Sequence, residues 1–228
     1  MINKFMKKDR VLVISPHPDD ETLGMGGSIA KLIHSGSDVF ILTVSGHLPP
    51  LYQKDDYKLS VKEAIKAYKI LGVKDFDFLE IPATMVNDLP VHKLNAMIGN
   101  VVKEFLPNQV FIPFPDRHID HRVIFESTMV ATRPIKESSK INLVAAYETL
   151  SETHWNAPYI EPNFTPNLVI DIDDYIEIKL EALRCYQSQI TDKEGPRSLS
   201  SVKSLAKFRG SQSGFNFGEA FFITRMTA

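Results

Sequence analysis

Short apolar runs alternate along the chain with longer segments in which apolar residues return every three or four positions. The short runs are typical of buried strands, and the longer periodic segments are typical of amphipathic helices. We expect strands at residues 11–15, 38–45, 75–81, 109–114, 142–150, 167–172 and 219–226. We expect helices at residues 24–36, 57–71, 90–106, 120–132, 173–188 and 201–210. This alternation predicts a doubly wound α/β fold, with a mostly parallel sheet and helices on both of its faces.

Nothing along the chain marks a boundary between domains. The sequence contains no repeat, low-complexity tract or linker, so we expect a single domain over residues 1–228. The C-terminal part, from about residue 140, is expected to complete the sheet and the substrate pocket. Hydrophobic residues make up 43% of the chain, which is ample for a core. The net charge of −2 gives no general electrostatic reason to bind nucleic acid or a membrane surface.

The cellular setting follows from a few further features. The only cysteine, Cys185, excludes an intramolecular disulfide. The first ten residues, MINKFMKKDR, lack the apolar core of a signal peptide, and no apolar run is long enough to span a bilayer. We therefore expect a soluble cytoplasmic protein whose partner is a small molecule, and we leave a homo-oligomer open.

Ionisable residues gather directly after two of the predicted strands. PHPDDE (16–21) follows the first strand, and PDRHIDH (115–121) follows the fourth. Ligands of doubly wound sheets sit beyond the carboxyl ends of the strands, so both segments are expected at the same edge. Either segment alone is also typical of a surface turn that begins a helix. Together they indicate a metal site.

His17, Asp20 and His121 suit a catalytic zinc ion, which takes three protein ligands and keeps a fourth position for water. The same two nitrogens and one carboxylate oxygen also suit Fe2+ or Co2+. Asp19 stands between two of these ligands along the chain and must point elsewhere. It is then free to act as a general base toward water at the metal.

The second segment adds two further candidate catalytic residues. One helical turn brings His118 and His121 to the same site. As an imidazolium, His118 would stabilise a tetrahedral oxyanion or protonate a leaving amine. Asp120 would orient His118 and keep it protonated. These parts together describe amide or ester hydrolysis.

The glycines of LGMGG (23–27) need a separate interpretation. A dinucleotide-binding turn would require a small residue where Ile29 stands, and the glycines begin well past the strand end. We interpret them as a site of close helix packing behind the metal-binding turn. A serine nucleophile is also poorly supported, because no Gly-x-Ser-x-Gly elbow follows a strand.

The two motifs resemble those of the PIG-L/LmbE-like family of metal-dependent N-acetylsugar deacetylases. PHPDDETLGMGG matches the first family motif, HIDHR (118–122) matches the second, and LGV (71–73) fits between them. The resemblance implies a Rossmann-like fold over nearly the whole chain. It also implies that His17, Asp20 and His121 bind zinc. The general base would be Asp19, and His118 would act on the tetrahedral intermediate with Asp120 as its partner.

By this resemblance the protein is a zinc-dependent N-deacetylase acting on an N-acetylglucosamine-type sugar or its conjugate. A metal-dependent amidase or esterase for a non-sugar acyl group is an alternative. A non-catalytic sugar- or nucleotide-binding domain is another, although Asp19 would have no task there. The chain departs from many family members at SGHLPP (45–50) and at Ser60 and Val61. Both departures fall in regions expected to face the substrate, so they leave the identity of the sugar open.

Four further residues are candidates for contact with the substrate. His47 ends the second predicted strand, and Trp155 offers an aromatic face for stacking on a sugar ring. Arg197 and Arg209 flank the last predicted helix and suit recognition of phosphate or carboxylate. Each has an ordinary structural alternative, namely a solvated loop, packing within the loop, or a surface ion pair.

Overall fold

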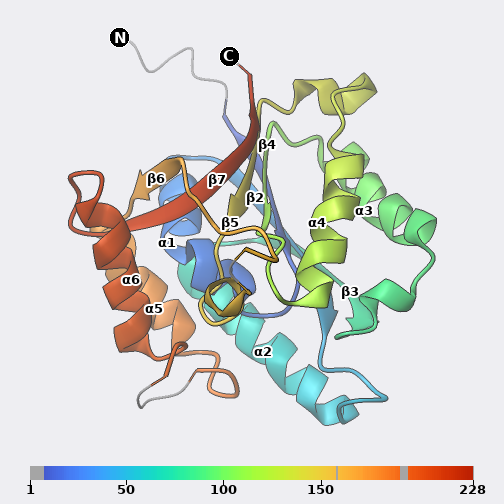
Figure 1. Ribbon diagram of the computed structural model, residues 1–228, viewed down its shortest axis with the longest axis horizontal. Helices are drawn as coiled ribbons and strands as arrows, with labels where there is room; N and C mark the ends of the chain where they lie inside the picture. Colours follow the sequence, from blue (N-terminus) through green and yellow to red (C-terminus); the bar gives the residue numbers. More distant parts are fainter. Residues whose placement is uncertain (1–7, 158, 191–194, 228) are drawn as a thin grey trace.

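One sheet of seven strands runs through the part of the chain that the computed structural model describes, residues 8–157, 159–190 and 195–227. The strand order is β3-β2-β1-β4-β5-β7-β6 (Figure 1). The strands are β1 Arg10–Ser15, β2 Asp38–Gly46, β3 Asp75–Pro82, β4 Gln109–Pro113, β5 Leu143–Tyr147, β6 Leu168–Asp171 and β7 Gly218–Met226. Strands β1 to β5 pair in parallel, whereas β7 pairs antiparallel with β5 and β6. The predicted mostly parallel sheet is confirmed.

Helices cover both faces of this sheet, as the sequence predicts. The α-helices are α1 Asp20–His34, α2 Lys54–Leu71, α3 Val91–Phe105, α4 Ile119–Ala131, α5 Ile176–Leu183 and α6 Leu199–Ser211. Short 3-10 helices occur at η1 Val86–Asp88, η2 Lys136–Lys140, η3 Thr153–Trp155 and η4 Asp173–Tyr175. Figure 1 shows α3 and α4 on one side of the sheet, and α1, α2, α5 and α6 on the other.

Strand β1 lies at the centre of the two cores that hold these layers together. Its residues Val11 and Val13 belong to the core beneath α1 and α2, and Leu12 and Ile14 belong to the core beneath α3 and α4. A strand that is buried on both faces needs an unbroken apolar run, because successive side chains point to opposite faces. This packing places the end of β1 deep in the molecule.

Helix α1 begins earlier than the periodicity predicts. It starts at Asp20 and not at residue 24, so the acidic residues Asp20 and Glu21 form its first turn. Acidic side chains are favourable in a first turn because the N-terminus of a helix carries partial positive charge. The predicted helix over 173–188 is shorter than expected, since η4 precedes α5 and α5 ends at Leu183.

The glycines of α1 allow neighbouring elements to approach closely. A Cβ on Gly24 would lie 2.3 Å from Cδ2 of Tyr147, and a Cβ on Gly27 would lie 2.8 Å from Cδ1 of Ile172. Both distances are too short for any side chain to fit without movement of its neighbours. The interpretation of these glycines as a site of close helix packing is confirmed.

The residues after 140 contribute β5, β6 and β7 to the same sheet, so the described part of the chain forms a single domain. Among all the described residues, no helix has both the length and the apolar character needed to cross a membrane.

Candidate active site

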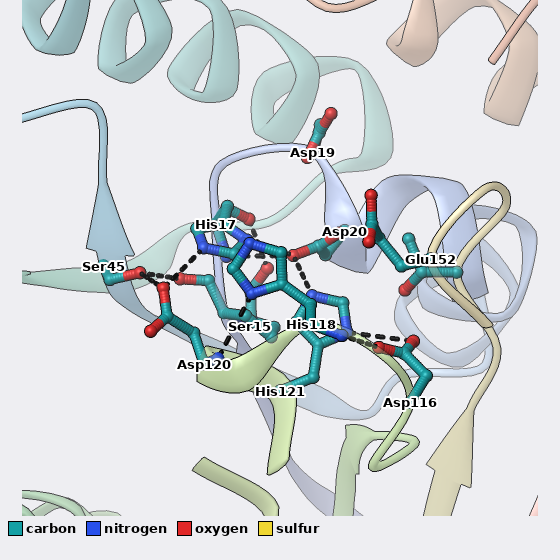
Figure 2. A network of polar contacts seen from close by, with 12 residues as sticks. Ser15, His17, Asp19, Asp20, Ser45, Asp116, His118, Asp120, His121 and Glu152 are labelled. Carbon is teal, nitrogen blue, oxygen red and sulfur yellow. Dashed lines mark hydrogen bonds and ion pairs between the residues drawn. The ribbon is translucent and has the colours of Figure 1, made fainter. Parts of the chain in front are cut away.

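The two ionisable segments meet at one edge of the sheet. Strands β1 and β4 are parallel neighbours, so the residues that follow Ser15 and Pro113 emerge side by side. Figure 2 shows the imidazole rings of His17, His118 and His121 gathered at this edge. The ring centroids of His17 and His118 are 4.6 Å apart, and those of His118 and His121 are 5.1 Å apart.

The carboxylate of Asp20 lies against a ring nitrogen of His17 and a ring nitrogen of His121. Oδ2 of Asp20 lies 3.0 Å from Nδ1 of His17 and 3.3 Å from Nε2 of His121. Tetrahedral ligands of a metal such as zinc are about 3.3 Å apart, given bond lengths of about 2.0–2.1 Å. His121 and Asp20 are buried, and both Nε2 of His121 and Oδ1 of Asp20 lack a hydrogen-bond partner among the described residues. These residues therefore fit a metal ion.

His118 lies close enough to take part in the same site. One donor atom each from His17, His118 and His121 lie within 4.8 Å of one another, so these three histidines also form a group that could hold a metal ion. The two candidate ligand sets share His17 and His121 and differ in the third ligand. Asp20 lies 3.0 and 3.3 Å from the two shared histidines.

A second layer of carboxylates supports the two shared histidines. Nε2 of His17 lies 3.1 Å from Oδ2 of Asp120, and Nδ1 of His121 lies 3.1 Å from Oδ2 of Asp116. Figure 2 shows these two carboxylates on opposite sides of the three rings. A carboxylate on the second ring nitrogen is the usual partner of a metal-binding histidine, because it fixes the ring and its tautomer.

Asp116 is a site residue that the sequence reasoning missed. Besides His121, its carboxylate accepts hydrogen bonds from the hydroxyl of Thr153 at 2.8 Å and from the backbone N–H of His118 at 3.0 Å. It is fully buried. The signal available in the sequence was its place in PDRHIDH, an acidic residue five positions before a candidate metal ligand.

Asp120 does not have the expected partner. Its carboxylate contacts His17 and accepts a hydrogen bond from the backbone N–H of Thr84 at 2.6 Å. Its contact with His118 is made by the backbone instead. The backbone N–H of Asp120 donates a hydrogen bond to Nδ1 of His118 at 3.2 Å. The physical reason is helix capping, because His118 is the N-cap of α4 and its side chain satisfies a free N–H of the first turn.

This cap determines the protonation of His118. Nδ1 accepts a hydrogen bond, so the proton of the neutral ring is on Nε2. Burial, together with the positive charges of His17 and His121, lowers the pKa of His118 to about 4. In place of the expected imidazolium, the structure favours a neutral ring with its proton on Nε2.

The other titratable groups of the site carry opposite charges in the absence of metal. Burial opposes the positive charge of His17, yet Asp120 and Asp20 outweigh it and raise the pKa to about 9. Burial likewise opposes the charge of His121, but Asp20 and Asp116 raise its pKa to about 10. Burial would raise the pKa of Asp20, whereas His121 and His17 hold it well below its usual range.

Asp19 is turned away from the donor atoms, as expected. Its Oδ2 lies 3.2 Å from Nη1 of Arg197, and its backbone φ of 129° is in the region that normally requires glycine. Residues held in such strained conformations cluster at functional sites. Burial raises the pKa of Asp19 to about 7, although Arg197 opposes the shift.

A pocket opens in front of these groups. The residues that line it come from separate segments of the chain, namely His17, Pro18, Asp19, His47, Tyr52, Ala83, Thr84, His118, Glu152, Gln189 and Arg197. Two of the four substrate-contact candidates, His47 and Arg197, are therefore at the pocket. Glu152, which the sequence reasoning missed, lies 3.6 Å from Arg197 and 3.4 Å from Arg117.

The other two candidates lie elsewhere. Arg209 forms a two-pronged ion pair with the buried carboxylate of Glu148, at 2.8 and 2.7 Å, and neither residue lines the pocket. Trp155 is 57% exposed, is not among the pocket residues, and packs against the guanidinium of Arg117. The residue types suited sugar or anion binding, but the fold gives Arg209 a structural partner and leaves Trp155 outside the pocket.

Fold and site together define a Rossmann-like α/β protein with a candidate metal site at the carboxyl edge of its sheet. The family model PIG-L, described as GlcNAc-PI de-N-acetylase, matches residues 12–132, which include both motifs. The chain belongs to this family of deacetylases. A curated relative, the diacetylchitobiose deacetylase of Thermococcus kodakarensis, is 30% identical over 92% of this chain and 81% of its own length.

Solved structures agree on the fold. The N,N'-diacetylchitobiose deacetylase of Pyrococcus horikoshii superimposes with a TM-score of 0.76 at 26% identity, over 98% of this chain and 86% of that one. A 4-carboxy-2-hydroxymuconate hydratase from Pseudomonas putida has the same fold, with a TM-score of 0.76 at 17% identity over 98% of each chain. The fold alone therefore does not determine the reaction.

Proposed function

We propose that this protein is a zinc-dependent hydrolase that removes the acetyl group from an N-acetylated amino sugar or its conjugate. The observation that carries the proposal is that the carboxylate of Asp20 lies against both His17 and His121, directly next to a pocket that His17 and Asp19 line, in a chain of the PIG-L family. The two diacetylchitobiose deacetylases named above act on an N-acetylated sugar, which supports the substrate class.

His17, Asp20 and His121 would hold the metal. A bound zinc ion polarises the acetyl carbonyl and lowers the pKa of a water molecule from about 15.7 to roughly 7. Two nitrogens and one oxygen also suit Fe2+ or Co2+, so the choice of zinc is part of the proposal. Asp116 and Asp120 are positioning residues, because each contacts the ring nitrogen of a ligand that faces away from the metal.

Asp19 would be the general base. It accepts the proton that the attacking water loses, and a pKa of about 7 suits this task near neutral pH. The ion pair with Arg197 holds the carboxylate at the pocket. The proton then passes to the nitrogen of the sugar as the C–N bond breaks, which leaves acetate and a free amine.

His118 would act as a neutral hydrogen-bond donor. Its Nε2–H stabilises the negative charge that develops on the carbonyl oxygen, and this needs no imidazolium. The role differs from the one expected from the sequence, because the helix cap at Nδ1 and the lowered pKa disfavour the charged ring.

The test is a substrate screen with purified protein reconstituted separately with Zn2+, Fe2+ and Co2+. N,N'-diacetylchitobiose, N-acetylglucosamine and N-acetylglucosaminyl conjugates are assayed for released acetate and free amine. We expect equal amounts of both products from at least one sugar, and turnover lowered by about 100- to 10,000-fold in the Asp19→Asn variant. Turnover confined to non-sugar amides or esters would favour the amidase or esterase alternative. Sugar binding without any acetate release would favour the non-catalytic alternative.

The remaining features of the proposal come from the sequence. We propose a small amino-sugar molecule as the partner and the cytoplasm as the location, and a homo-oligomer stays open. Size-exclusion chromatography with light scattering and fractionation of cells address the last two points directly.

A further inference from the structure

Helix α1 is broken one turn after the candidate metal ligand that it carries. Met25 has φ −146° and ψ 24°, which are not helical values, so two helical segments meet there. Asp20 lies on the first, short segment. The angle at the break therefore decides where the carboxylate of Asp20 points relative to the rest of the molecule. Whatever holds the break also holds this ligand.

A buried ion pair lies against the break. Lys179 of α5 and Glu219 of β7 are 2.6 Å apart, and their side chains are 4% and 2% exposed. They reach the same point of α1 from two different elements, both in the C-terminal part of the chain. A buried ion pair contributes little net stability, because removing two charges from water costs about as much as their attraction returns. Its presence calls for a more specific role.

Each end of the ion pair satisfies backbone groups of the broken helix. Nζ of Lys179 donates to the carbonyl of Leu23 at 2.8 Å. The carboxylate of Glu219 accepts from the backbone N–H of Gly27 at 3.0 Å and from that of Ser28 at 2.6 Å. In an unbroken helix, the carbonyl of Leu23 and the N–H of Gly27 would be partners. Here the ion pair provides a partner for each of them.

The glycines next to the break make this contact possible. A Cβ on Gly26 would lie 3.3 Å from Cγ of Lys179, so the stem of the lysine rests against the bare backbone. Glu219 is also well placed, because its carboxylate lies at the N-terminus of the second helical segment, where free N–H groups and partial positive charge favour an anion.

We propose that Lys179 and Glu219 are positioning residues that fix the break in α1 and thereby direct Asp20 at the metal. They touch neither the pocket nor the metal ligands. Their effect is carried by the backbone of α1 from Leu23 to the first turn of the helix. This inference rests on the proposed metal site.

The test measures metal affinity in folded protein, by competition of the wild type and variants with a chelator for Zn2+. Glu219→Leu removes the acceptor of both N–H groups and is expected to weaken binding by about tenfold or more. Glu219→Gln keeps one acceptor oxygen and should recover part of the affinity. With Co2+ in place of Zn2+, the absorption bands of the metal should shift in Glu219→Leu, because the position of Asp20 changes.

Val102→Ala is the matched control, because Val102 is a buried residue of α3 in the other core and its truncation destabilises the protein without touching α1. It should leave the affinity and the Co2+ spectrum unchanged. If Glu219→Leu does not fold, Gly26→Ala takes its place, since its methyl group crowds the stem of Lys179 and the substitution keeps both charges.

The outcomes separate this inference from the function on which it rests. Wild-type affinity and an unchanged Co2+ spectrum in Glu219→Leu, or in Gly26→Ala where the former does not fold, would overturn the positioning role and leave the proposed function intact. A wild-type protein that binds no transition metal would overturn the proposed function, and this inference with it.

Discussion

Replacement of Asp116 by asparagine isolates the contribution of one supporting carboxylate. Asparagine has nearly the same shape, so the packing of this fully buried position is preserved. In the native site, one carboxylate oxygen faces Nδ1 of His121 and the other accepts the backbone N–H of His118. An amide has only one acceptor oxygen. Whichever way it is turned, its NH2 group faces one of these two positions.

The consequence for His121 is a change of tautomer. The orientation that keeps the backbone N–H of His118 satisfied places an NH2 group against Nδ1 of His121. Nδ1 must then accept, and the proton of the ring moves to Nε2, the nitrogen that faces the metal. The metal has to displace that proton. Loss of such a supporting partner typically weakens metal binding by about 10- to 100-fold, which corresponds to about 1.4–2.7 kcal/mol.

Chelator competition at neutral pH measures this affinity, and thermal unfolding of the metal-free protein checks that the fold is retained. Thr153→Val is the control, because it removes one hydrogen bond to Asp116 and leaves the contact with His121 in place. It should change the affinity by less than the range given for Asp116→Asn. If Asp116→Asn binds metal as tightly as the wild type, the carboxylate does not set the tautomer of His121 and the reasoning is wrong.

Three further predictions follow from the geometry and charges of the site. At pH 7 the metal-free rings of His17 and His121 are protonated, since their pKa values are about 9 and 10, and a metal requires both to be neutral. Metal binding should therefore release protons and tighten as the pH rises, which calorimetry in buffers of different ionisation enthalpy can measure; no proton release would contradict these pKa shifts. Asp19→Asn should lower turnover by about 100- to 10,000-fold and keep the metal, as acetate assays and elemental analysis would show, whereas loss of metal would make Asp19 a ligand. Gly24→Ala should lower the free energy of unfolding by about 1–3 kcal/mol in urea titrations, because the new methyl group meets Tyr147, and unchanged stability would mean that the ring moves freely.

The local pattern of apolar and polar residues was sufficient to predict the architecture and the two ionisable segments that form the site. The apolar run of β1 predicts a strand buried on both faces, because no polar residue interrupts either face. The rule that parallel strands end at one edge then brings residues 16–21 and 115–121 together. Spacing also predicted that His17 and Asp20 share one turn and that Asp19 points away from them, and the structure has both features.

The partners of the polar side chains were decided by the tertiary structure alone. Asp120 contacts His17 because the side chain of His118 caps α4, and Arg209 pairs with Glu148 and lies away from the pocket. These contacts join residues far apart in the chain and depend on the direction of each side chain at a helix end or loop. Hydrophobic periodicity determines which face of an element is buried, but it contains no information about which distant polar group lies across from it.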